Sequence, residues 1–392
     1  MQSVLMRWQA SSFFGWGILG LNLFEHWAGD PDIQPLMGVH MTAQHMAGID
    51  PLKYTVLQPA IAASNQFLEE LTAGTIRLQE RGVIVIDSFG NGFTPLPVSV
   101  GGVGARNVAR CIFEDTRLGS TQRVEGYDNL LCASEWNAAL LREVSRKPVT
   151  MIHEGIDHSL FFPGPRSGVL DPECFYVFTG GKIEFRKAQD LVILAFREFA
   201  ARHDDAVLVA AWNSPWPEFS AGFQGKLQAP LRQGSNGALE VRRWATENGI
   251  APHQFIELPL MPNYMMPSVL REMDCALQPS RGEACTNLPA KEAMATGVPV
   301  ILANNSGTRD LIDTDNCIAL TTQDPVIFKP GFGTEGWGES RVEEIVAALE
   351  KLYTDTQARK RIGTRGADWI LEKRRTWRDH AASLKAHLRT LL

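Results

Sequence analysis

The stretch Ser280–Val300 constrains the fold of this chain more than any other part of its sequence. Pro289 suits the first turn of a helix, where its missing N–H is not needed, and residues 290–296 are mostly good helix formers. Gly297 is expected to end that helix, and the apolar run Val300–Leu302 then reads as a buried strand. The sequence therefore predicts a polar loop, a short helix and a strand, which together are a unit of an α/β protein.

Two carboxylates, Glu283 and Glu292, bracket this loop and helix. The backbone amides around Thr286, Asn287 and Leu288 come just before the helix, where the positive end of the helix dipole also favours an anion such as a phosphate. Glu292, one turn inside the helix, is placed to accept two hydroxyls of a ribose. The alternative is that both acids are ordinary solvated side chains at a helix end.

A second pattern that favours anion binding begins at the predicted strand Phe175–Phe178. This strand runs directly into a glycine turn that contains Gly181, and the cations Lys182, Arg186 and Lys187 follow. A diphosphate requires close backbone approach and charge neutralisation, and this segment offers both. A cluster of charges on the surface is the alternative interpretation.

The N-terminal segment spells Gly-x-Gly-x-x-Gly from Gly15 to Gly20, behind a strand predicted over residues 3–8. This pattern is the dinucleotide-binding fingerprint, so an NAD enzyme has to be considered. Several residues separate the strand from the glycines, however, and the next predicted strand, Ile33–Val39, ends without an acid that could hold a ribose. The segment therefore argues against NAD binding.

The stretch Ser280–Val300 resembles the acidic-pair motif of the retaining glycosyltransferases of family GT4, within glycosyl transferases group 1. In that family the first Glu contacts the donor sugar and the second contacts the ribose of the nucleotide, which assigns these roles to Glu283 and Glu292. The two acids enclose eight residues here, one more than the family pattern has. Lys182 and the pair Arg186–Lys187 resemble the basic element of the same family.

The resemblance implies the GT-B fold, in which two Rossmann-like α/β domains face a cleft and a C-terminal helix crosses back to the first domain. We expect an acceptor-side domain over residues 1–165, a donor nucleotide-sugar domain over residues 169–366 and the returning helix over residues 367–392. The stretch 163–168 is rich in proline and glycine, which is typical of a domain linker.

The implied activity is that of a hexosyltransferase, which moves a sugar from a nucleotide-diphosphate sugar to a hydroxyl of a glycan, lipid-linked or other acceptor. Retention of anomeric configuration, and catalysis without a metal or another cofactor, belong to the same expectation. Two alternatives remain open. One is a GT-B phosphorylase, which would carry a pyridoxal cofactor on a lysine, and the other is a catalytically silent protein that binds a sugar or a nucleotide.

On the donor side, the resemblance assigns catalytic roles to Glu283, Arg186 and Lys187. The full set of expected donor-binding residues is Gly17, Gly181, Lys182, Arg186, Lys187, Leu258, Thr286, Asn287, Leu288 and Glu292. Gly17 is expected to allow close backbone approach, and the backbone of Leu258 is expected to face the nucleobase.

On the acceptor side, the sequence predicts a helix over residues 65–80 and a strand over residues 82–86. Many GT4 members place a histidine after this strand, but here Asp87, Asn91 and His40 are the candidates for its role. Glu114 and Asp115 end the next predicted strand and are expected to hold acceptor hydroxyls. The acceptor-side residues are thus Trp16, His40, Asn91, Glu114 and Asp115.

The net charge of -6 argues against nucleic acid as a partner. The tail from Gln357 to Leu392 nevertheless holds 10 Lys/Arg and 3 Asp/Glu residues, so contact with an anionic membrane surface is an alternative to a solvated helix face. The six cysteines show no metal-ligand spacing, and reduced thiols are expected. We therefore expect a cytoplasmic protein, with peripheral contact at the inner face of the membrane as the variant.

Overall fold

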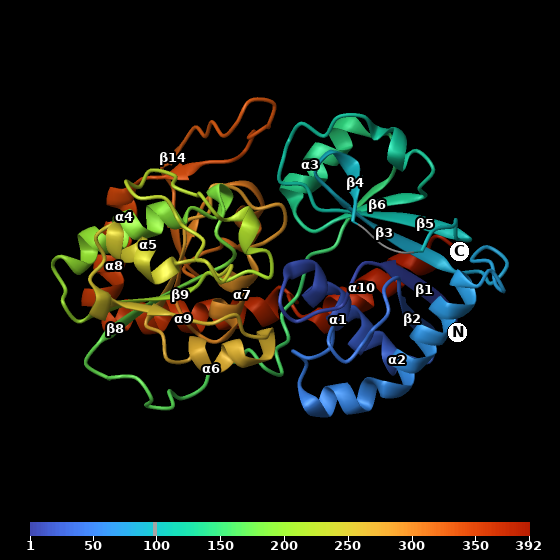
Figure 1. Ribbon diagram of the computed structural model, residues 1–392, viewed down its shortest axis with the longest axis horizontal. Coiled ribbons are helices and arrows are strands. Elements are labelled where there is room, and N and C mark those ends of the chain that lie inside the picture. The colour runs from blue at the N-terminus through green and yellow to red at the C-terminus, as the bar shows by residue number, and fades with distance from the viewer. Residues whose placement is uncertain (97–99) are drawn as a thin grey trace.

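Two parallel β-sheets divide the molecule into two lobes in the computed structural model, which describes residues 1–96 and 100–392 (Figure 1). The first sheet has the order β2-β1-β3-β5-β6-β7, and the short β4 pairs antiparallel with β3. Its strands are β1 (Gln2–Arg7), β2 (Ile33–Met37), β3 (Ile84–Gly90), β4 (Thr94–Pro95), β5 (Arg106–Cys111), β6 (Asn129–Cys132) and β7 (Val149–Met151).

The second sheet has the order β10-β9-β8-β11-β12-β13, and all its neighbouring strands are parallel. Its strands are β8 (Phe175–Gly180), β9 (Ala206–Ala211), β10 (Phe255–Glu257), β11 (Cys275–Gln278), β12 (Val300–Ala303) and β13 (Ile318–Leu320). Helices cover the faces of both sheets, so the central strands are buried on both sides and consist of apolar runs such as Val300–Ala303. Each lobe is therefore an α/β domain with a parallel sheet, as the sequence predicts.

Ten α-helices lie in the described ranges. They are α1 (Gly15–Ala28), α2 (Pro51–Thr72), α3 (Glu135–Val144), α4 (Gln189–Ala200), α5 (Val241–Glu247), α6 (Met266–Leu270), α7 (Leu288–Ala295), α8 (Val342–Thr354), α9 (Thr356–Glu372) and α10 (Trp377–Arg389). None of the helices in the described part of the chain is long and apolar enough to cross a membrane.

Helix α2 differs from the helix predicted over residues 65–80, because it begins at Pro51 and ends at Thr72. The side chain of Asp50 accepts hydrogen bonds from the backbone N–H groups of Leu52 and Lys53, which satisfies donors at the helix start. Pro51 occupies the first turn, where it costs no hydrogen bond. The true start therefore carries a strong capping signal that the prediction did not use.

The end of the chain is shared between the two lobes. Helix α9 packs against α7 in the second lobe, whereas α10 crosses to the first lobe and lies along α1 (Figure 1). Trp377 and Leu384 are buried in the core of the first lobe, and the indole N–H of Trp27 donates to the carbonyl oxygen of Ala381 over 3.2 Å. The returning helix thus begins at Trp377, while residues 367–372 still belong to α9.

Candidate active site

The start of helix α7 has the capped form that its sequence predicts. The side-chain oxygen of Asn287 accepts a hydrogen bond from the backbone N–H of Ala290 over 3.0 Å, and Gly297 ends the segment with a φ of 78°. Beside this cap, the hydroxyl of Thr286 is buried and has no hydrogen-bond partner among the described residues. A buried polar group without a partner costs free energy, which a bound ligand oxygen would recover.

Glu283 lies directly against two cations. Its carboxylate oxygens are 2.5 Å from Nη1 of Arg186 and 2.7 Å from Nζ of Lys187, and they also accept hydrogen bonds from Ser280 and Asn287. The residue is only 5% exposed. Burial by itself would raise the pKa of Glu283, but Lys187 and Arg186 lower it to about 2. Glu283 is therefore a fixed, ionised carboxylate.

Arg186 is the charge centre of this cluster. Its guanidinium contacts Glu283 and Glu184 from the second lobe, and it also reaches Glu114 of the first lobe over 2.8 Å. Burial would lower the pKa of Arg186, yet the carboxylates around it raise that pKa, so the guanidinium stays charged. The ion pair with Glu114 joins the predicted donor side to the predicted acceptor side.

Glu292 is as buried as Glu283, with 6% exposure, but its surroundings differ. One of its carboxylate oxygens accepts a hydrogen bond from the side-chain amide of Asn263 over 2.6 Å, and no ion pair to it is present in the described ranges. Burial raises the pKa of Glu292 to about 7, which Asn263 and the neighbouring Lys291 only partly oppose. A buried carboxylate without a cation is typical of a site that binds a ligand.

Lys291, next to Glu292, turns away from it. Its ammonium group donates to the carbonyl oxygens of Glu154 and Gly155 over 3.0 and 3.4 Å, at the end of the first lobe. Burial lowers the pKa of Lys291 to about 8. Lys291, the cation next to Glu292 in sequence, therefore binds the first lobe and does not act as a counter-ion of Glu292.

The glycine turn after β8 packs on the start of α7. A Cβ atom added at Gly180 would lie 3.2 Å from Pro289, and Gly181 adopts a φ of 113° that side chains rarely tolerate. Lys187 follows this turn and binds Glu283. Lys182 is the exception, because its side chain is largely exposed and pairs only with Glu184 over 3.5 Å among the described residues. Two segments predicted independently from the sequence thus form one cluster.

The start of α1 faces this cluster from the first lobe. A Cβ atom at Gly15 would lie 3.8 Å from Cδ1 of Leu288, so Gly15 stands opposite the start of α7. Gly17 packs instead on Ser11, because a Cβ atom added at Gly17 would lie 2.5 Å from the Cβ atom of Ser11. Close packing therefore explains why this position is a glycine. The indole of Trp16 packs edge-on against that of Trp8, with ring centres 5.6 Å apart.

The predicted acceptor-side residues separate into different roles. The side-chain oxygen of Asn91 accepts hydrogen bonds from the backbone N–H groups of Glu114 and Asp115, over 2.7 and 3.0 Å, and so shapes their loop. Asp87 binds Arg7 and Tyr127 within the first lobe. His40 is exposed on another loop, where its backbone oxygen is hydrogen-bonded to the ring of His45. The structure brings Glu114 to the cluster and leaves His40 outside it.

Leu258 follows β10, where the sequence places the nucleobase. Its backbone N–H donates to the carbonyl oxygen of Ala210, and its own carbonyl oxygen accepts from the side-chain amide of Asn213 over 2.6 Å. Both backbone groups are therefore engaged in this structure. The contact between Leu258 and a base stays a prediction, and it requires Asn213 to move or to join in the binding.

Sequence reasoning missed several side chains that hold the two acids in place. Ser280 and Ser306 bind the carboxylate and the backbone N–H of Glu283, and Asn263 binds Glu292. Asn263 lies far from Glu292 in sequence, on the segment before α6, and no local pattern marks it as a partner. Only the fold brings these residues together.

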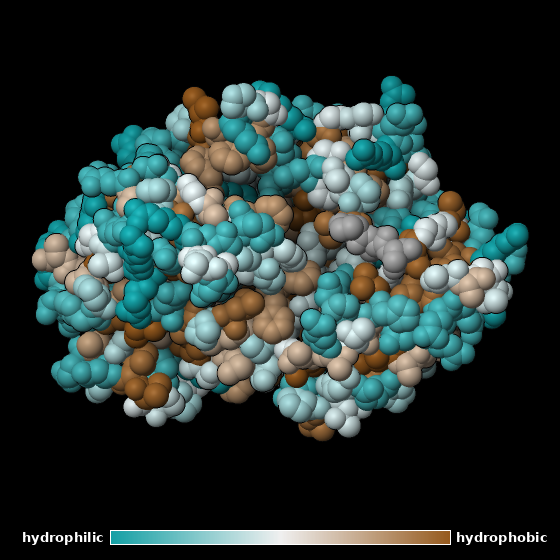
Figure 2. All heavy atoms as spheres, viewed as in Figure 1, coloured by the Kyte–Doolittle hydropathy of each residue, from teal (hydrophilic) through white to brown (hydrophobic). Residues whose placement is uncertain are grey.

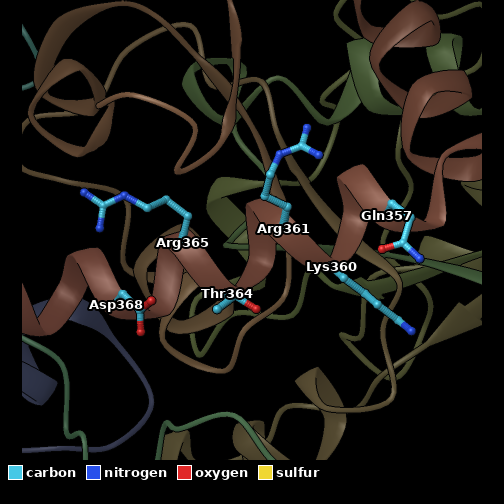
Figure 3. Close-up of a pocket in the computed structure, with 6 residues that line it drawn as sticks. All are labelled: Gln357, Lys360, Arg361, Thr364, Arg365 and Asp368. Atoms are coloured by element: carbon cyan, nitrogen blue, oxygen red, sulfur yellow. The ribbon is translucent and has the colours of Figure 1, made fainter.

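A shallow hollow lies away from this cluster, on the surface of α9. It measures about 430 Å³, and Figure 3 shows Arg361 and Arg365 pointing outward beside it. Its lining residues are Gln357, Lys360, Arg361, Thr364, Arg365 and Asp368. The acid and cation cluster itself is covered, since Arg186 is 7% exposed, although the molecular outline is notched between the lobes (Figure 2). The two lobes therefore cover most of the cluster in this structure.

Two Rossmann-like lobes with this cluster between them define a glycosyltransferase of the GT-B class. The sequence profile of glycosyl transferases group 1 matches residues 166–369, and the chain belongs to that family. A search of curated proteins found no sequence match. Among the described residues, no group of His, Cys, Asp or Glu side chains is arranged to hold a metal ion.

Solved structures confirm the predicted GT-B fold over the whole chain. Sucrose-phosphate synthase from Thermosynechococcus elongatus matches with a TM-score of 0.66 and 16% identity, covering 100% of this chain and 99% of that one. Anabaena Alr3699/HepE in complex with UDP and glucose matches with a TM-score of 0.63 and 12% identity, covering 100% of both chains. A glycosyltransferase from Rickettsia africae matches with a TM-score of 0.63 and 10% identity, covering 100% and 98%.

Proposed function

We propose that this chain is a retaining GT4-type hexosyltransferase, which moves a sugar from a nucleotide-diphosphate sugar to an acceptor hydroxyl without a metal ion. The observation that carries this proposal is the convergence of the two motif segments. Arg186 and Lys187 meet Glu283 at the start of α7, and Glu292 stays buried without a cation one turn away. Because HepE has been crystallised with UDP-glucose, uridine donors are the first to test.

The donor diphosphate would lie at the start of α7. When the bond from the anomeric carbon to the phosphate oxygen breaks, its electron pair goes to that oxygen, and negative charge develops on the diphosphate. Arg186, Lys187 and the more exposed Lys182 can stabilise this charge, and the Thr286 hydroxyl can donate to it. This preorganised arrangement supplies what a metal ion would otherwise provide.

The two acids would bind different parts of the donor. Glu283 is held by cations and two further donors, so it suits the orientation of sugar hydroxyls and not nucleophilic attack. Glu292 has lone pairs free for the two hydroxyls of a ribose. The charge of Glu283 is already compensated, whereas Glu292 would gain its partners only from the ligand.

The acceptor would enter from the first lobe, beside Glu114, Asp115 and Trp16. Its hydroxyl attacks the anomeric carbon, and its proton passes to an oxygen of the departing diphosphate. Glu114 contacts Arg186 in this structure, so it would have to exchange that contact for one with the substrates. The acceptor is a glycan, lipid-linked or other hydroxyl compound in this proposal.

The test is an assay of sugar transfer with UDP-, GDP-, ADP- and TDP-linked hexoses. NMR of the product would give the anomeric configuration, and the assay would be repeated with a chelator. The proposal predicts transfer with one donor class, retention, and no loss of rate in the chelator. Donor binding without transfer or hydrolysis, over a broad panel of acceptors, would instead support the catalytically silent alternative.

We also propose that any contact with an anionic membrane uses the outer face of α9. Lys360 and Arg361 are exposed there, whereas Lys385 and Arg389 of α10 bind Asp30 and Asp32 of the first lobe. Cosedimentation with vesicles that contain phosphatidylserine tests this. Lys360→Glu combined with Arg361→Glu should abolish binding, and binding that survives this change would contradict the proposal.

A further inference from the structure

Residues 325–338, here called the strap, extend from the second lobe toward the first. They connect β14 (Gln323–Asp324) with β15 (Glu339–Ser340), which pair antiparallel and form the base of the strap. In Figure 1 the strap is the orange hairpin above the second lobe, and it reaches toward the lobe that carries α3. The two motif segments of the sequence lie elsewhere, and neither the predicted donor set nor the predicted acceptor set contains a strap residue.

The strap binds the first lobe through polar contacts. The indole N–H of Trp136 donates to the carbonyl oxygen of Glu335 over 3.1 Å, and the hydroxyl of Thr116 donates to the carboxylate of Glu335. The backbone N–H of Gly333 donates to the carboxylate of Asp115 over 2.7 Å. A side chain at Gly336 would clash with the Trp136 indole, so the two surfaces fit closely.

The strap also packs on the donor-side cluster. Trp337 covers Gly282, the residue before Glu283, so closely that a Cβ atom at Gly282 would clash with its ring. Phe328 stacks on Phe185, next to Arg186, with ring centres 4.7 Å apart and planes 9° from parallel. The strap therefore touches the segments that carry both Glu283 and the cations.

Glu114 is the point where these contacts meet. Its backbone carbonyl oxygen accepts a hydrogen bond from the indole N–H of Trp337 over 3.1 Å, while its carboxylate binds Arg186 over 2.8 Å. Asn91 holds the same loop from behind. Trp337 thus fixes the backbone that carries the side chain facing the main cation of the site.

We propose that the strap positions the loop 114–116 against Arg186 when the two lobes close. Trp337 is the positioning residue, because its N–H holds the backbone of Glu114 while the side chain of Glu114 binds Arg186. Trp337 is not among the residues expected to bind a substrate, so it acts through Glu114. The closure part of this inference rests on contacts between the lobes alone, and only its effect on turnover rests on the proposed function.

Cys285 offers a native reporter of closure. Its side chain is buried against Ala133 of the first lobe, so separation of the lobes exposes it. The combined change Trp136→Phe and Thr116→Val removes the three hydrogen bonds that these side chains make with Glu335 of the strap, and it leaves every predicted donor residue in place. Because each such hydrogen bond contributes modestly, we expect maleimide to label Cys285 about tenfold faster, measured by peptide mass spectrometry.

The control is Ile327→Ala, which changes a strap residue that is 91% exposed and should label like the wild type. Melting temperatures of all variants exclude general unfolding as the cause. A folded double variant that labels at the wild-type rate would overturn the role of the strap in closure.

The positioning role of Trp337 requires a kinetic test. Trp337→Phe keeps an aromatic ring beside Gly282 but removes the N–H that binds Glu114, together with one ring of the indole. We expect kcat to fall about tenfold while the KM for the donor changes less than threefold. Unchanged kcat in this folded variant would contradict the inference. If the wild type transfers no sugar at all, the proposed function fails, and the Cys285 labelling still decides the closure claim.

Discussion

The two ends of one loop and helix place two equally buried carboxylates in opposite electrostatic surroundings. Glu283 lies between Arg186 and Lys187 and has a pKa of about 2, whereas Glu292 has an amide partner and a pKa of about 7. Burial raises the pKa of both, so the two cations and the hydrogen bond from Ser280 account for the lower pKa of Glu283. The comparison teaches that the charge of Glu283 is already compensated within the protein, whereas Glu292 is buried without a cation in the described ranges and can gain hydrogen-bond donors from a ligand.

The largest expected effect follows from removing a cation beside Glu283. Arg186→Ala or Lys187→Ala should lower turnover by about 10² to 10³ fold, because each is expected to stabilise charge on the leaving diphosphate. Arg243→Ala is the matched control, since Arg243 is exposed on α5, lies outside every predicted set and pairs with Glu240 and Glu247. It should change turnover much less. Steady-state rates with the best donor measure the two variants and the control. Near-normal turnover in both Arg186→Ala and Lys187→Ala would contradict a role of these cations in catalysis.

The next effect is on stability, and the two acids should respond in opposite directions. Glu283→Gln removes the counter-ion of Lys187 and one of the three carboxylates around Arg186, so it should lower the free energy of unfolding by about 3 kcal/mol. Glu292→Gln removes an unpaired buried charge, so it should be neutral or stabilising at pH 8. Urea unfolding at pH 8 measures both. Equal destabilisation would mean that the electrostatic difference between the acids is not real.

A smaller effect concerns the pH dependence of stability. The pKa of Glu292 is raised from 4.5 to about 7 on folding, so the native state holds a proton that the unfolded state releases. Its contribution is therefore present below pH 4.5 and is lost as the pH rises toward 7, by about 2 kcal/mol between pH 5 and 7. Glu283 has the opposite sign, because its lowered pKa gives stability that disappears only as the pH falls from 4.5 toward 2.

The measurement is the difference in unfolding free energy between the wild type and Glu292→Gln over this pH range. The wild type should lose stability relative to the variant as the pH rises from 5 to 7. Parallel curves would show that Glu292 titrates in its ordinary range and carries no burial penalty.

The smallest effect concerns the hydroxyl of Thr286. Thr286→Val keeps the shape of the side chain and removes a buried group that has no partner in the described part of the chain. Stability should stay within about 0.5 kcal/mol of the wild type, since no hydrogen bond within the protein is lost. The KM for the donor should rise, up to about tenfold, if the hydroxyl binds a phosphate oxygen. A clear loss of stability without a change in KM would assign the hydroxyl a structural role.

Local signals in the sequence predicted much of the fold. Pro289 and Gly297 delimit α7 as expected, because proline at a helix start and glycine past its end act within a few residues. The start of α3 is likewise local, because the side chain of Ser134 accepts a hydrogen bond from the backbone N–H of Asn137. The start of α2 at Pro51 was missed, although its cap, Asp50, is also local.

The arrangement of the site could be predicted only in part. The family resemblance singled out Glu283 and Arg186 separately, but their contact joins residues 97 positions apart. The partner of Glu292, Asn263, and the whole strap carry no periodic or motif signal, because their roles depend on how the lobes meet. Sequence patterns thus identify the charged groups of the site, and the fold decides which of them remain without a partner.

The central claim is that Glu292 binds the ribose hydroxyls of the donor nucleotide. Calorimetric titration should first identify the nucleoside diphosphate that binds best, and then compare it with its 2′-deoxy analogue in the wild type and in Glu292→Gln. We expect the ribonucleotide to bind the wild type at least about tenfold more tightly than the analogue, and the difference to shrink below threefold in the variant. An undiminished preference in the variant, or no binding of any nucleotide to the wild type, would contradict the account.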